Sequence, residues 1–124
     1  MNKYFAIGDI HGCLDKLQKL INKLPINKEL DTLVFIGDYI DRGSFSKEVI
    51  DYVINLRSRF NNVVCLSGNH EQMFLNYLAG TDEIMYLYNG GNATLLSYGI
   101  SIAASPLQRK AAVPASHLNF FRTL

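Results

Sequence analysis

The chain has 124 residues, with 12 Lys and Arg against 11 Asp and Glu, and a formal net charge of +1. This length suits one domain, and 48% hydrophobic with 19% charged residues is typical of a globular protein rather than a disordered one. The even charge balance argues against wholesale binding to nucleic acid or to anionic membranes. The apolar runs are too short to cross a bilayer.

The amino terminus shows no long apolar core followed by a small-residue cleavage site, so no signal peptide is expected. Cys13 and Cys65 are the two cysteines, which is too few for a disulfide scaffold. We therefore expect a reducing, cytoplasmic setting and read both thiols as structural.

Three short apolar runs, each stopped by a glycine, predict strands, and each is followed by apolar residues at the three- and four-residue spacing of a helix. The predicted strands span residues 4–7, 33–36 and 63–66. The predicted helices cover residues 14–24, 49–56 and 73–78. Pro25 ends the first of these helices.

This alternation predicts an α/β fold with a parallel sheet covered by helices on both faces. Crossovers between parallel strands are nearly always right-handed, so the carboxyl ends of consecutive strands meet at one edge. Open α/β sheets bind their ligands at that edge.

The remainder of the chain is less regular. We expect a turn at residues 89–92, a short helix over 93–98 closed by Gly99, weak patterning over 101–112, and a last helix opened by Pro114. Because three strands make a small sheet and the last helical pattern runs to the chain end, we expect a single domain over residues 1–124 that is truncated at its carboxyl end.

Three polar loops follow the predicted strands: loop 1 is residues 8–12, loop 2 is residues 37–43 and loop 3 is residues 68–71. Together they carry carboxylates, two of the three histidines, an amide and a guanidinium, a mixture that suits a hard or borderline divalent cation. Asp9 and His11 are two residues apart, so both can point at one ion. A single loop of this kind is a common turn after a strand, but three such loops at one edge of the sheet predict a metal site.

The loop sequences Gly-Asp-Ile-His-Gly, Gly-Asp-Tyr-Ile-Asp-Arg-Gly and Gly-Asn-His-Glu resemble the three signature blocks of the calcineurin-like metallophosphoesterases. More closely, they resemble the phosphoprotein phosphatase branch, which includes bacterial serine/threonine protein phosphatases. The downstream Asn89-Gly90-Gly91 with Thr94 also looks like small bacterial members. The resemblance implies the first half of a four-layer α/β/β/α sandwich.

The resemblance also implies a dinuclear phosphomonoester hydrolase in which a metal-bridging water attacks phosphate directly. It assigns Asp9 and His11 to the first metal, Asp38 as a bridge between both metals, and Asn69 to the second metal and the substrate phosphate. Arg42 would hold phosphate oxygens. His70 would be the general acid, with Asp41 hydrogen-bonded to it. Glu71 would brace loop 3.

The implied cofactors are two divalent ions, with manganese favoured and iron or zinc possible. The implied substrate is a phosphorylated protein or a small phosphomonoester, with no nucleic acid and no membrane partner. The family's second half supplies two further histidines and another arginine that this sequence lacks. We therefore expect one weakly bound ion and poor catalysis, and His117 reads as a surface or helix-packing residue.

Two alternatives stay open. The first is a dinucleoside polyphosphate hydrolase of the same superfamily; those relatives tend to lack the second acid of loop 2 and to carry Asp after the loop 3 histidine, whereas this chain has Asp41 and Glu71. The second is a non-catalytic metal- or phosphate-binding remnant. A nucleic-acid phosphodiesterase is disfavoured by the charge balance. Tyr86 and Tyr88 read as packing residues.

Overall fold

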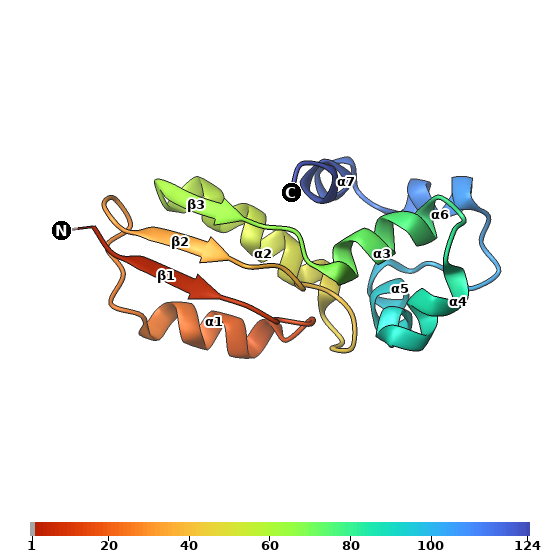
Figure 1. Ribbon diagram of the computed structural model, residues 1–124, viewed down its shortest axis with the longest axis horizontal. Coiled ribbons are helices and arrows are strands. Elements are labelled where there is room, and N and C mark those ends of the chain that lie inside the picture. Colours follow the sequence, from red (N-terminus) through yellow and green to blue (C-terminus); the bar gives the residue numbers. More distant parts are fainter. Residues whose placement is uncertain (1) are drawn as a thin grey trace.

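The computed structural model describes residues 2–124. Its sheet contains three parallel strands in the order β1 (Tyr4–Ile7), β2 (Thr32–Phe35) and β3 (Asn62–Cys65). The α/β class and the three parallel strands are confirmed, with β2 and β3 each starting one residue earlier than predicted. All three strands point toward the same end of the sheet (Figure 1).

Helices α1 (Leu14–Lys23) and α2 (Ser46–Arg59) are the two crossovers. They bury an apolar stripe against the sheet, as their three- and four-residue spacing predicts. Leu33 and Phe35 of β2 are fully buried beneath them, in a core that includes Leu17 of α1 and Val53 of α2.

The prediction of helices on both faces of the sheet is wrong for residues 2–124. Two right-handed crossovers between strands in the order β1-β2-β3 turn the same way, so both helices lie on one face. The other face carries exposed apolar side chains. They are Tyr4, Ile36, Val64 and Leu66, which are 76%, 51%, 43% and 47% exposed.

A group of short helices continues the chain beyond the carboxyl ends of the strands (Figure 1). These are α3 (Asn69–Leu78), α4 (Glu83–Tyr86), the π-helical segment η1 (Leu87–Gly91), α5 (Asn92–Tyr98), α6 (Pro106–Ala112) and α7 (Ala115–Arg122). The turn predicted at residues 89–92 falls on the end of η1 and the first residue of α5; Asn89 and Gly90 leave helical geometry there, and Gly90 has φ +92°. The helix over 93–98 and the last helix are confirmed, whereas α6 falls in a stretch predicted to be weakly patterned.

Aromatic packing joins these helices. Phe74 of α3 contacts the rings of Tyr86, Tyr98 and Phe121, which come from α4, α5 and α7. The helical group is therefore a continuation of the core rather than a loose appendage, and it rests directly on the edge where loops 1, 2 and 3 emerge. Among residues 2–124, no helix has the length and apolarity needed to cross a membrane.

Candidate metal centre and catalytic pair

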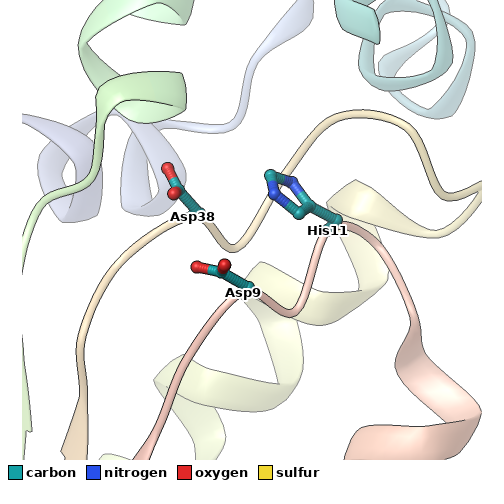
Figure 2. A group of neighbouring side chains, drawn as sticks. All are labelled: Asp9, His11 and Asp38. Atoms are coloured by element: carbon teal, nitrogen blue, oxygen red, sulfur yellow. The ribbon is translucent and has the colours of Figure 1, made fainter.

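Asp9, His11 and Asp38 form one group at the carboxyl edge of the sheet. Each offers one ligand atom, and these atoms all lie within 4.8 Å of one another. Figure 2 shows the three side chains converging from the loop after β1 and the loop after β2. The sequence placed these residues at one edge, and the structure brings them together as a group able to hold an ion.

The donor set fits a divalent ion. His11 Nδ1 lies 2.7 Å from the Ile40 carbonyl oxygen, so this nitrogen carries the proton and donates it. Nε2 is thereby left with its lone pair free for a metal, the arrangement usual for metal-binding histidines. With two carboxylates beside it, the group offers the mixed nitrogen and oxygen ligands that manganese, iron or zinc accept.

Backbone hydrogen bonds connect loop 1 to loop 2. His11 N–H donates to the Asp38 carbonyl at 3.0 Å, and Gly43 N–H donates to the His11 carbonyl at 3.0 Å. A Cβ atom at Gly43 would lie 2.2 Å from the His11 oxygen and 2.9 Å from the carbonyl carbon of Gly12. The spacing of the metal ligands therefore depends on a position where no side chain fits.

Backbone strain concentrates in the same loops. Six non-glycine residues of the described chain adopt positive φ, and five of them belong to loops 1 and 2. They are Asp9, His11, Asp38, Asp41 and Arg42, with φ between +44° and +74°. Left-handed backbone costs an L-residue energy and persists where the surrounding structure enforces it, which is common at functional sites.

Glu71 ties loop 3 to loop 2. Its fully buried carboxylate accepts backbone N–H bonds from Asp38 at 2.7 Å, Tyr39 at 2.9 Å and Gly68 at 2.9 Å. Burial raises the pKa of Glu71, and these three donors oppose that shift by stabilising the charged form. The geometry matches the bracing function expected from the sequence.

Asp41 and His70 form a buried pair. His70 Nδ1 lies 2.7 Å from Asp41 Oδ2, and the two side chains are 8% and 0% exposed. The carboxylate fixes the ring so that Nε2 is the nitrogen left for other chemistry. The His70 and His11 rings meet edge to face with centroids 4.6 Å apart, so this pair borders the metal-ligand group.

Two residues that the sequence left out of the site also bind Asp41. The hydroxyls of Tyr86 and Thr94 each lie 2.6 Å from Asp41 Oδ1. Burial raises the pKa of Asp41, and the bonds from Thr94, Tyr86 and His70 counter this. The pKa of Tyr86 is raised well above its usual value by burial and by the Asp41 charge, so its hydroxyl keeps the proton that it donates.

Arg42 of loop 2 and Asn69 of loop 3 are both exposed at the same edge of the sheet. Arg42 is exposed, its N–H donates to the Gly90 carbonyl at 3.0 Å, and its side-chain stem lies against Gly90. Asn69 is the exposed first residue of α3 and follows Gly68, where an added Cβ would lie 2.3 Å from Asp38 Oδ1. Their roles toward phosphate and a second metal stay predictions.

The remaining histidine is a buried packing residue, and the two cysteines differ in exposure. His117 is 1% exposed and links Tyr98 and Asp51 through its two ring nitrogens, at 2.6 Å and 2.5 Å. It is therefore a helix-packing residue, one of the two possibilities that the sequence left. Burial raises the pKa of the Cys65 thiol, which makes it unreactive, and Cys13 is exposed at the start of α1.

The chain is similar to proteins described by two different activities. A serine/threonine-protein phosphatase 1 from Salmonella typhimurium is 38% identical over 88 residues, which is 71% of this chain and 38% of that protein. A symmetrical bis(5'-nucleosyl)-tetraphosphatase from Pseudomonas syringae pv. syringae is 40% identical over 67 residues, or 54% of this chain and 22% of that protein. The chain thus spans well under half the length of these relatives.

The fold agrees with these similarities. The crystal structure of a putative diadenosine tetraphosphatase superposes with a TM-score of 0.64 at 22% identity, covering 98% of this chain and 42% of that one. The family model described as calcineurin-like phosphoesterase matches residues 3–114, which include all three loops. The chain therefore belongs to the calcineurin-like phosphoesterase family.

Proposed function

We propose that this chain supplies the metal-binding and proton-donating residues of a divalent-metal-dependent phosphomonoester hydrolase of the serine/threonine protein phosphatase type. The observation that carries the proposal is the convergence of Asp9, His11 and Asp38 within 4.8 Å. The buried Asp41–His70 pair, with its 2.7 Å hydrogen bond, lies against the same group.

Asp9, His11 and Asp38 would hold an ion, with Asn69 as a further oxygen ligand for a second. When bound, divalent ions supply positive charge to phosphate oxygens and make a water molecule more acidic. Manganese is the metal that we would assay first.

The chain's own residues would do the rest. An alkoxide is a poor leaving group, so a proton given to it by His70 Nε2 assists its departure. Asp41 holds the ring of that imidazole through the hydrogen bond to Nδ1. Arg42, exposed beside Gly90, has the planar fork that forms paired bonds with phosphate oxygens.

A second candidate is hydrolysis of dinucleoside tetraphosphates. It is supported by relatives, since proteins described as symmetrical bis(5'-nucleosyl)-tetraphosphatases occur more often than phosphatases among those similar to this chain. We prefer the protein phosphatase because both members of the Asp41–His70 pair are present and in contact.

The test is hydrolysis with added manganese, compared between the native chain, Asp38→Asn and the matched control Asp15→Asn, which alters an exposed carboxylate on α1. Because Asp38 belongs to the ligand group, its loss should abolish p-nitrophenyl phosphate turnover, while Asp15→Asn should not change it. Equal rates in all three proteins would contradict the proposal.

A second assay separates the two substrate classes. A phosphoserine peptide and diadenosine tetraphosphate are offered at equal concentration, and released phosphate and ADP are measured. Faster release of phosphate supports the protein phosphatase, and faster release of ADP supports the tetraphosphatase. Inactivity on both substrates in the presence of manganese would contradict both candidate functions.

A further inference from the structure

The carboxylate of Asp41 is enclosed by donors on both oxygens. Oδ2 receives the bond from His70, whereas Oδ1 receives the hydroxyls of Tyr86 and Thr94, each at 2.6 Å. Asp41 is 0% exposed, so water does not orient it. The plane of this carboxylate is therefore set by the two hydroxyls, and the plane in turn sets the direction of the bond to His70.

The two hydroxyls come from elements outside the three loops. Tyr86 ends α4 and Thr94 lies in α5, 45 and 53 residues along the chain from Asp41. The Thr94 oxygen also accepts the Asp41 backbone N–H at 2.9 Å, so Thr94 contacts both ends of that residue. α4 and α5 thus contact Asp41 directly through these hydroxyls, and Gly90 adds a backbone bond to the neighbouring Arg42.

The Tyr86 ring is itself held in place. It is fully buried between Phe74 and Tyr77, with ring centroids 5.8 Å and 5.3 Å away. Its edge lies where a Cβ of Gly91 would stand, 2.4 Å from the nearest ring carbon. Because the ring cannot move, its hydroxyl has a fixed position. A hydrogen-bond donor in a fixed position can hold a carboxylate in one orientation.

We propose that Tyr86 and Thr94 are positioning residues that orient the Asp41 carboxylate, and through it His70, for proton donation. The proposal rests on the proposed function, because it matters to catalysis only if His70 protonates a leaving group. If the two hydroxyls merely satisfied a buried carboxylate, their removal would lower stability and leave the His70 bond in place.

The first experiment observes that bond without requiring activity. In the metal-free chain labelled with ¹⁵N-histidine, the three histidines make three different bonds: His70 to Asp41, His11 to the Ile40 carbonyl, and His117 to Asp51. Tyr86→Phe and Thr94→Val should broaden or lose the His70 Nδ1–H signal and leave the other two unchanged. Thr94→Ser should restore it.

Tyr98→Phe is the matched control, because it removes another buried tyrosine hydroxyl, one that lies 2.6 Å from His117 Nδ1. It should alter the His117 signals and leave His70 as it is. A His70 signal unchanged in both Tyr86→Phe and Thr94→Val would overturn the proposal. So would the loss of all three histidine signals together, since that reports general unfolding.

The second experiment links the bond to catalysis. An aryl phosphate has a good leaving group and needs little help from an acid, whereas an alkyl phosphate needs it. Tyr86→Phe should slow the alkyl ester about tenfold more than the aryl ester, a small part of the total effect of a general acid. Equal slowing of both esters would overturn the positioning role. If the native chain hydrolyses neither ester, that result counts against the proposed function, and the NMR experiment alone then decides whether Tyr86 and Thr94 position His70.

Discussion

Gly43 stands so close to His11 and Gly12 that loops 1 and 2 meet without any side chain between them. His11, Asp9 and Asp38 keep their positions through that contact and through the backbone bonds around it. Gly43 supplies no ligand atom, but its close approach to loop 1 helps to set the positions of the three metal-binding side chains.

Replacing Gly43 by Ala should consequently separate the two loops. Its Cβ would lie 2.2 Å from the His11 oxygen, a backbone atom that has little freedom to move. We expect a loss of about 1–3 kcal/mol in the free energy of unfolding, typical of overpacking, together with weaker manganese binding. Urea unfolding and metal titration measure the two effects.

Gly99→Ala is the control for this change. Gly99 has φ +69° with no atom near its missing Cβ, so alanine there meets backbone strain of about 1 kcal/mol and no clash. Manganese affinity should stay native in Gly99→Ala. An equal loss of affinity in both variants would show that the close approach at Gly43 is unimportant.

Much of the metal group could be predicted from the sequence, because the loop residues follow apolar strands directly. Asp9, His11 and Asp38 are fixed by short-range spacing and by the parallel topology. Tyr86 and Thr94 could not be assigned in this way. A tyrosine among apolar residues has the pattern of a core residue, and only the packing of α4 and α5 on loop 2 reveals its hydroxyl contact.

The same limit appears at the scale of elements. Strong periodicity allowed α1 and α2 to be predicted, whereas α6 lies among small residues without an apolar stripe. The sequence features that favour α6 are local. Ser105 and Gln108 form a reciprocal capping box, and Pro106 occupies the first turn of the helix. The open sheet face was missed because continuous apolar strands do not reveal which of their faces a helix covers.

Asp31 connects two elements. It is 4% exposed, and its carboxylate accepts the N–H of Lys3 before β1 at 2.9 Å and of Asn27 before β2 at 2.8 Å. The bonds from Asn27 and Lys3 lower the pKa of Asp31 from its ordinary value of 3.8. The resulting stability is complete above the ordinary pKa and is lost as the pH falls through the lower pKa of the folded state.

Asp31→Asn should therefore destabilise the chain at pH 7 and have a much smaller effect in strong acid, where the native carboxyl is also neutral. Urea midpoints measured across this pH range check the expectation. Asp15→Asn, on the exposed face of α1, should shift the midpoint little at any pH. If the loss of stability in Asp31→Asn stays constant with pH, the ionised carboxylate of Asp31 is not the source of that stability.

At the scale of the whole molecule, one face of the sheet is covered and the other is not. Tyr4, Ile36, Val64 and Leu66 are between 43% and 76% exposed on that open face. Contiguous apolar surface of this kind favours association, and β1 and β3 add free strand edges. Solution behaviour should therefore depend on protein concentration.

Val64→Lys should reduce this self-association by placing a charge on the open face, in the edge strand β3. Ile84→Lys is the control, because Ile84 is 85% exposed on α4, away from the sheet. Sedimentation at increasing concentration should show more monomer for Val64→Lys than for the native chain or Ile84→Lys. Identical profiles for all three would mean that the open face does not drive association.

Asp9, His11 and Asp38, from two loops at one edge of the sheet, form a group able to hold a metal ion. The most direct measurement is a calorimetric titration of the metal-free chain with manganese, beside Asp38→Asn, His11→Ala and Asp15→Asn. We expect saturable binding in the native chain and in Asp15→Asn, and none in the two ligand variants. Absence of saturable binding in the native chain, or equal binding by all four proteins, would contradict it.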